Sequence, residues 1–161
     1  MSGSKIRVLV VDDYEPWRRY VRVALLANDG LQIVGEVIDG SEAIEKAQEL
    51  QPDLILLDIG LPTLNGIAAA RGIRKVSPTA KILFVSENRS PEIAQAALGT
   101  GAGGYVVKSD AASELLAAIS AVLKGKPFIS ASLAGHFLVA ATLATTTQAI
   151  SWVVNLVSGM S

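Results

Sequence analysis

Three aspartates stand at the ends of apolar runs, where carboxylates can gather around a metal ion. Asp12 and Asp13 follow the run Ile6–Val11, and Asp58 is the last residue of the run 54–58. Such runs are typical of parallel strands buried on both faces, whose last residues emerge at the sheet edge where open α/β folds bind ligands. Carboxylates gathered there repel one another unless a cation lies among them, and Mg²⁺ prefers such hard oxygen ligands. We therefore expect Asp12, Asp13 and Asp58 to form a Mg²⁺ site.

Two further polar residues end strand-like runs. Ser86 ends the run KILFVS, and Lys108 ends the run YVVK. A hydroxyl can donate to an oxyanion, and a lysine supplies a fixed positive charge. Together with a metal ion and Asp58 as carboxylate nucleophile, these groups would form a site that accepts a phosphoryl group as an aspartyl phosphate. Each of these residues alone also fits an ordinary turn or helix start, but their common position at strand ends favours the phosphoryl site.

The elements that must position these residues follow a regular alternation. Strand-like runs alternate with segments of helical periodicity, and no repeat or low-complexity linker interrupts them. This alternation predicts a flavodoxin-like, doubly wound α/β domain over residues 1–127, with a five-stranded parallel sheet in the order 2-1-3-4-5. The expected strands are 6–11, 31–38, 54–58, 81–86 and 105–108, and helices are expected to begin near Pro16, Ser41, Asn65, Ser90 and Asp110.

The overall composition narrows the class of protein. The chain has 161 residues with 14 basic and 15 acidic side chains, and its formal net charge of −1 gives no general attraction for nucleic acid or anionic membranes. The absence of cysteine excludes disulfides, thiol catalysis and cysteine-bound metal. No apolar signal region precedes the first strand, so a cytoplasmic location is expected.

These motifs resemble the receiver domain of two-component response regulators over roughly residues 5–126. The resemblance rests on Asp12-Asp13 after the first strand, LLDIGLP around Asp58 with Asn65-Gly66 behind it, ILFVS ending at Ser86, and GGYVVK ending at Lys108. The segments GEVIDGSEA at 35–43 and KGKPFIS at 124–130 are most similar to the NarL/FixJ branch. Receivers of that branch precede a DNA-binding helix-turn-helix.

The resemblance implies a role for each acidic residue. Asp58 would accept a phosphoryl group from a histidine kinase or a phosphotransfer protein. Asp13, Asp58 and the backbone carbonyl of Gly60 would bind Mg²⁺ directly, and Asp12 would bind it mainly through water. The protein would then be a phosphoacceptor rather than an enzyme, with autophosphotransfer and autodephosphorylation as its only chemistry.

The resemblance also implies a switch. Lys108 would pair with the phosphoryl group and Ser86 would hydrogen-bond it. Tyr105 takes the place of the aromatic switch residue, which turns inward when Ser86 moves. The face formed by the fourth helix, the fifth strand and the fifth helix would carry the output to a protein partner.

The segment 128–161 differs from the rest, because it contains no Asp, Glu, Lys or Arg. It is too short for a four-helix DNA-binding module and has no basic residue to neutralise phosphates, so direct nucleic-acid binding is not expected. A helix over this segment would be apolar nearly all round and would have to be buried, which favours a homodimer or another bound partner. The expected seam has heptad-like spacing and comprises Val139, Leu143, Ile150, Val153 and Val157.

Several alternatives remain open at this point. The segment 128–161 could instead attach the receiver to a membrane, or be a disordered or truncated end. The chain could be a shortened NarL/FixJ-type transcription regulator that lacks its DNA-binding domain. A flavin-binding protein of the same fold is less favoured, because its phosphate would face Asp12 and Asp13. A phosphatase of the haloacid dehalogenase type would need a second aspartate where Gly60 stands.

Overall fold

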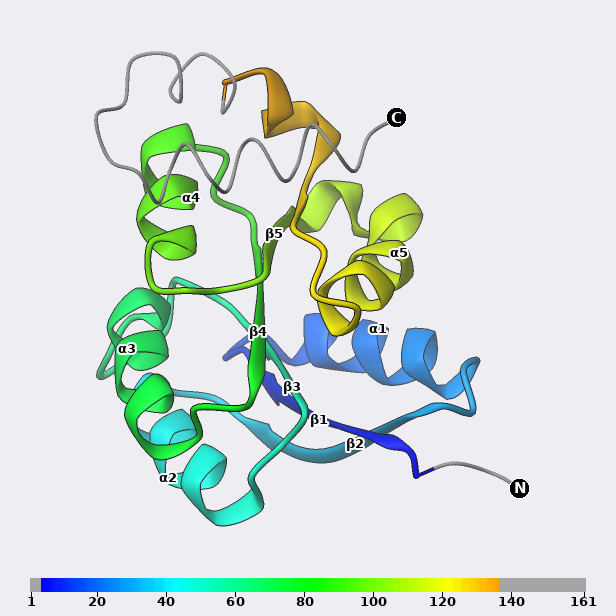
Figure 1. The fold of residues 1–161 in the computed structure, drawn as a ribbon, viewed down its shortest axis with the longest axis vertical. Helices are drawn as coiled ribbons and strands as arrows, with labels where there is room; N and C mark the ends of the chain where they lie inside the picture. Colours follow the sequence, from blue (N-terminus) through cyan, green and yellow to red (C-terminus); the bar gives the residue numbers. More distant parts are fainter. Residues whose placement is uncertain (1–3, 137–161) are drawn as a thin grey trace. The chain divides into compact units, whose positions relative to one another are not determined.

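The computed structural model describes residues 4–136 of the chain, and Figure 1 shows them as coloured ribbon. The described part consists of strands that alternate with helices. The described residues divide into two compact units, with the boundary between Ile82 and Leu83. Strand β4 (Lys81–Ser86) begins in the first unit and continues into the second.

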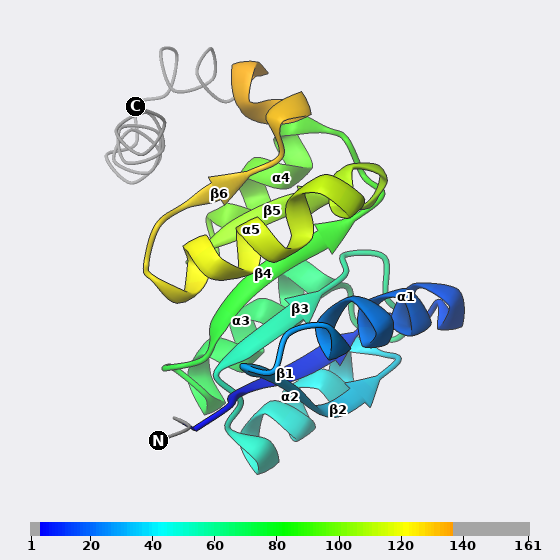
Figure 2. The same ribbon diagram turned by 90° about the vertical axis from the view of Figure 1, so that its right-hand side faces the viewer.

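The first unit contains three paired parallel strands. Strand β1 (Ile6–Val11) lies between β2 (Leu31–Val37) and β3 (Leu54–Leu57), with Val11 opposite Val37 on one side and Leu57 on the other. Every residue of β3 is buried, as expected for a strand covered on both faces. Helix α1 (Glu15–Leu26) covers one face of these strands, and α2 (Gly40–Leu50) and α3 (Gly66–Val76) cover the other (Figures 1 and 2).

The second unit repeats the pattern. Strand β5 (Gly104–Val107) pairs in parallel with β4 and with the short strand β6 (Phe128–Ile129). Helices α4 (Pro91–Leu98) and α5 (Ala111–Leu123) lie on opposite faces of these strands (Figures 1 and 2). A 3₁₀ turn, η1 (Lys108–Asp110), connects β5 to α5, and residues 131–136 are helical.

The fold class predicted from the sequence is confirmed. The strands form one parallel sheet with the order β2-β1-β3-β4-β5-β6, which extends the predicted order 2-1-3-4-5 by one strand. Strand β6 is not predictable from the sequence, because two residues after Pro127 are too few to show a periodic pattern. Ile129 of this strand is buried opposite Tyr105.

Side-chain caps begin three of the helices, as the sequence indicates. Asp39 accepts a hydrogen bond from the N–H of Glu42 at 2.7 Å, and Asn65 accepts one from Ala68 at 3.0 Å. Ser90 caps α4 in the same way. Asp110 occupies the N-cap position of α5, near which this helix was expected to begin, but its side chain makes no capping bond. Asp110 is also the last residue of the 3₁₀ turn, and its Oδ2 accepts a hydrogen bond from the hydroxyl of Ser132 at 2.8 Å.

The predicted oligomerisation seam lies outside the described residues. This holds for Val139, Leu143, Ile150, Val153 and Val157 alike. Within residues 4–136, none of the helices is long and apolar enough to cross a membrane.

Candidate phosphoryl-accepting site

The structure brings the three predicted acidic residues together. Strands β1 and β3 are neighbours and run in parallel, so Asp12 and Asp58 leave the sheet side by side. The N–H of Asp58 donates to the carbonyl of Val11 at 3.0 Å, which continues the ladder to this point. One carboxylate oxygen from each of Asp12, Asp13 and Asp58 lies within 4.8 Å of the others.

The burial of this cluster is uneven. Asp12 is 1 % and Asp58 8 % exposed, whereas Asp13 is exposed. Backbone N–H groups orient the two buried carboxylates, since Tyr14 donates to Oδ1 of Asp12 at 2.9 Å and Ile59 donates to Oδ1 of Asp58 at 2.8 Å. Three carboxylates so close together repel one another, and a divalent cation among them would relieve that repulsion. The possible ligands are hard carboxylate oxygens, and the cluster is exposed to solvent at Asp13. This fits a Mg²⁺ ion that keeps some of its waters.

The backbone around Asp58 is tightly packed at two glycines. A Cβ on Gly66, the first residue of α3, would lie 1.9 Å from the carbonyl oxygen of Asp58. A Cβ on Gly40, at the start of α2, would lie 1.9 Å from the carbonyl oxygen of Leu64. Two helix starts therefore press against the loop that follows Asp58. Gly60 in the same loop has no atom within 4 Å of an added Cβ, so its backbone is open on that side.

The remaining predicted residues belong to the second unit. Ser86 ends β4 and lies opposite Val107 of β5, so Ser86 and Lys108 stand at the same end of this pair of strands. Ser86 is buried, and its hydroxyl oxygen accepts a hydrogen bond from the N–H of Asn88 at 3.1 Å. Lys108 begins the 3₁₀ turn η1.

Tyr105 is fully buried on β5. Its ring lies against Phe84, with the ring centroids 6.4 Å apart. Its hydroxyl donates to the backbone carbonyl of Asn88 at 2.8 Å, within the segment that leads from Ser86 to α4. The side chain proposed as a switch residue is therefore turned inward and tied to the backbone just after Ser86.

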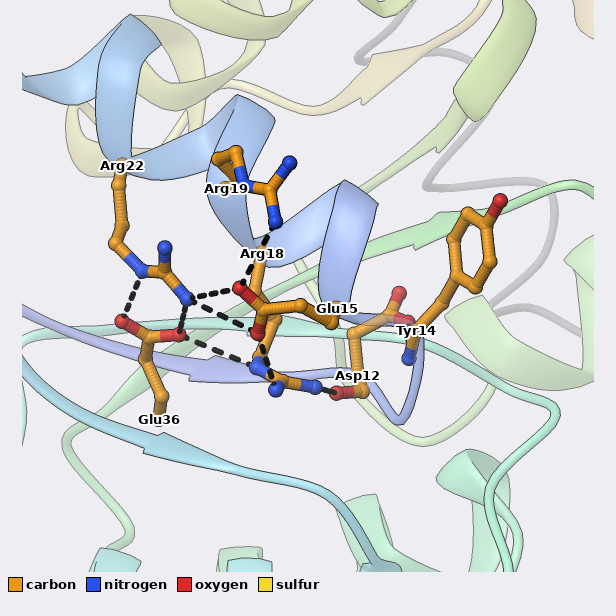
Figure 3. Close-up of polar contacts among 7 residues, drawn as sticks. All are labelled: Asp12, Tyr14, Glu15, Arg18, Arg19, Arg22 and Glu36. Atoms are coloured by element: carbon orange, nitrogen blue, oxygen red, sulfur yellow. Dashed lines mark hydrogen bonds and ion pairs between the residues drawn. The ribbon is translucent and has the colours of Figure 1, made fainter.

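Beside the acidic cluster lies a network of charged residues that was not expected from the sequence (Figure 3). Arg18 and Arg22 on α1 share two carboxylates, Glu15 on the same helix and Glu36 on β2. The hydrogen bond from Arg22 lowers the pKa of Glu15, and its bonds to Glu36 and Glu15 raise the pKa of Arg22. The spacing of Glu15, Arg18 and Arg22 along one face of a helix could have indicated the ion pairs within α1, although not those with Glu36.

Comparison with known proteins identifies the family of the chain. The family described as "Response regulator receiver domain" matches residues 8–120, which include all five predicted strand-end residues. The chain belongs to this receiver family. A receiver is a phosphoacceptor, and its function is phosphorylation-controlled signalling in two-component systems.

Individual relatives support the same assignment. The receiver is 36 % identical to the response regulator GacA of Pseudomonas viridiflava over 129 residues, which are 80 % of this chain and 60 % of GacA. A solved LuxR-family response regulator from Aurantimonas sp. SI85-9A1 is 35 % identical, with a TM-score of 0.78 over 82 % of this chain and 94 % of that one. The receiver domain of NarL from Mycobacterium tuberculosis is 32 % identical, with a TM-score of 0.72 over 76 % and 99 % of the two chains.

These relatives agree with the NarL/FixJ-like branch predicted from the segments at 35–43 and 124–130. The chain spans 60 % of the length of GacA, so what the whole of that protein does is not carried over to it.

Proposed function

We propose that Asp58 accepts a phosphoryl group from a histidine kinase or a phosphotransfer protein. The proposal is carried by the gathering of Asp12, Asp13 and Asp58 within 4.8 Å at the ends of two neighbouring strands. Asp58 follows β3 and is only 8 % exposed, so little of its carboxylate is open to solvent. The backbone N–H of Ile59 fixes the orientation of its carboxylate.

Mg²⁺ would be held by Asp12, Asp13, Asp58 and the backbone carbonyl of Gly60. When bound, the ion neutralises charge on the carboxylates and on the incoming phosphoryl group. The carboxylate of Asp58 forms the new O–P bond while the P–N bond of the donor phosphohistidine breaks and the imidazole leaves with the electron pair. Asp13 is the exposed member of the cluster and would lie on the side from which the donor enters.

Lys108 and Ser86 would respond to the new charge. Phosphorylation adds about −1.5 to −2 charges and three strong acceptor oxygens. Lys108 would pair with that charge, and the Ser86 hydroxyl would turn to donate to it. Rotation of the Ser86 hydroxyl would break the hydrogen bond that it accepts from the N–H of Asn88. The carbonyl of Asn88 also accepts a hydrogen bond from the Tyr105 hydroxyl. The segment before α4 would then move, together with Tyr105, and alter the surface offered to a protein partner.

The experiment is acid-stable labelling of the receiver with radioactive acetyl phosphate and Mg²⁺. Asp58→Asn should abolish the label, because the amide cannot form an acyl phosphate. Asp53→Asn is the matched control, since Asp53 lies at the other end of the same strand and binds the N–H of Arg7 at 2.8 Å. Label that persists in Asp58→Asn would place the phosphoacceptor at another residue.

We also infer that the chain acts in the cytoplasm and forms a homodimer through the segment 128–161, as its charge-free apolar sequence indicates. Removal of residues 137–161 keeps the part of the chain tied to α5 and should give a monomer by light scattering. An unchanged mass would contradict the dimer. Flotation of the full chain with vesicles would instead support a membrane-attached receiver, and a gel shift with DNA would support a shortened transcription regulator.

A further inference from the structure

Asp12 is held through its backbone N–H, its carboxylate and its backbone carbonyl, and the carbonyl belongs to the peptide group that joins Asp12 to Asp13. The N–H of Asp12 donates to the carbonyl of Val37 on β2 at 3.0 Å, and Oδ1 of Asp12 accepts from the N–H of Tyr14 at 2.9 Å. The carbonyl oxygen of Asp12 accepts Nη1 of Arg18 at 2.8 Å. The last contact is the one made by a side chain from α1, and it fixes the plane of the peptide between two of the proposed metal ligands.

The Arg18 guanidinium is itself held in place by two carboxylates. Its Nη2 donates to Glu15 at 2.6 Å and its Nε donates to Glu36 at 3.2 Å, so three different nitrogens serve three different acceptors. The side chain is 15 % exposed. Only a planar guanidinium can reach all three acceptors at once, because a lysine presents one compact ammonium. Figure 3 shows Arg18 between these carboxylates and Asp12.

Arg22 provides an internal comparison. It donates to the same two carboxylates, to Glu36 through Nε at 2.7 Å and to Glu15 through Nη2 at 2.9 Å. Among residues 4–136, the hydrogen bonds of Arg22 all go to these two side chains, and unlike Arg18 it makes none with the loop at Asp12. The two arginines thus differ in one respect that bears on the acidic cluster, the bond to the Asp12 carbonyl.

We propose that Arg18 is a positioning residue for the metal site, which holds the Asp12–Asp13 peptide in the geometry that binds Mg²⁺. The inference rests on the proposed function, because it assigns the support of the same site. Residues that orient metal ligands without touching the metal commonly change its affinity when they are removed. Here the support also opposes the mutual repulsion of the carboxylates, which would otherwise push the loop outward.

The sign of the effect separates this role from simple electrostatics. Arg18 is a cation beside a cation-binding cluster, so removal of its charge alone would make Mg²⁺ bind more tightly. Loss of a positioning contact would make Mg²⁺ bind more weakly. A general loss of stability would lower the folded fraction and the signal amplitude, but it would leave the Mg²⁺ concentration at half-saturation of the folded protein unchanged.

The test is a Mg²⁺ titration of the full chain carrying Trp152→Phe, so that the fluorescence comes from Trp17, which lies one residue before Arg18. Urea unfolding of each variant accompanies it. Arg18→Ala should raise the half-saturating Mg²⁺ concentration roughly tenfold. Arg22→Ala should stay close to the unsubstituted chain. Arg18→Lys keeps the positive charge but loses the several N–H donors of the planar guanidinium. Its half-saturating Mg²⁺ concentration should rise, as in Arg18→Ala. With acetyl phosphate, saturating Mg²⁺ should restore the labelling rate of both Arg18 variants.

The other outcomes would contradict either the role of Arg18 or the Mg²⁺ site itself. Unchanged or tighter Mg²⁺ binding in Arg18→Ala, or an equal shift in Arg22→Ala, overturns the role of Arg18. Failure of both Arg18 variants to unfold cooperatively would make Arg18 a residue of the fold and would also overturn it. If the unsubstituted chain does not bind Mg²⁺, the metal site of the proposed function fails, and this result is distinct from the others.

Discussion

Replacement of Gly66 by alanine is the sharpest test of how the backbone of Asp58 is supported. Gly66 is the first residue of α3, and its N–H donates to the carbonyl of Ile59 at 2.8 Å. An alanine Cβ at this position would lie 1.9 Å from the carbonyl oxygen of Asp58, 2.8 Å from its carbonyl carbon and 2.9 Å from the Cα of Ile59. All three atoms are backbone, so no side-chain rotation can relieve the contact.

The size of the effect follows from this overlap. To restore a contact of 3.0 Å, the Asp58 backbone or the start of α3 must move by about 1.1 Å. Overpacking in a well-packed region costs about 1–3 kcal/mol, and contact with backbone puts this case at the upper end. Alanine at a helical position recovers at most about 1 kcal/mol relative to glycine. We therefore expect Gly66→Ala to lower the free energy of unfolding by about 2 kcal/mol.

The assay is urea unfolding at constant pH, with a thermal melt beside it. A loss of about 2 kcal/mol corresponds to a Tm lower by roughly 4–8 °C for a chain of this size. Gly60→Ala is the matched control for stability, since no atom lies within 4 Å of its added Cβ, and it should stay within about 0.5 kcal/mol of the unsubstituted chain. Gly66→Ala should also slow labelling of Asp58 by acetyl phosphate. Equal stabilities for the two variants would refute the packing argument.

Two further predictions concern the second unit. The buried Ser130 hydroxyl accepts the N–H of Val107 at 2.8 Å and donates to Glu114 at 2.7 Å. Ser130→Ala should therefore lower the free energy of unfolding by urea by about 1–3 kcal/mol. The control is Ser113→Ala at an exposed position of α5, the helix that carries Glu114, which should cost little. Equal losses would contradict the bridge. Hydrogen bonding at its own backbone N–H lowers the pKa of Glu92 below its ordinary 4.5, so its ionised form stabilises the fold above pH 4.5 and this contribution is lost as pH falls through the folded-state pKa. An NMR titration of the Glu92 carboxyl carbon with a midpoint at or above 4.5 would show this prediction to be wrong.

The parts of the fold that the sequence predicts well are those encoded locally. Buried parallel strands require continuous apolar runs, and β1 and β4 have the predicted bounds. Helix caps are also local, because a side chain such as Asn65 bonds to an N–H three residues away. These features need no knowledge of the rest of the chain. They place Asp12, Asp13 and Asp58 at strand ends, and the predicted strand order, which makes β1 and β3 neighbours, brings them to one edge.

The parts that it does not predict depend on contacts between distant residues. Asp110 is a residue type that often caps helices, but a 3₁₀ turn precedes α5 at this point. The hydroxyl of Ser132, a residue distant in the sequence, donates a hydrogen bond to its carboxylate. Strand β6 exists because β5 offers an unpaired edge, rather than because Phe128 and Ile129 form a pattern. The contact of Arg18 with Glu36 depends on the placement of α1 against β2, which periodicity alone does not fix.

The close packing at Gly40 and Gly66 has a mechanical consequence. Helix starts clamp the loop after Asp58 at both points, and an added methyl group would meet backbone 1.9 Å away at each. A phosphoryl group on Asp58 would therefore be attached to a rigid part of the backbone. The loop 59–66 would keep its position on phosphorylation, and other segments would move. Amide hydrogen exchange in this loop should stay the same before and after phosphorylation, while the displaced atoms are found elsewhere in the chain.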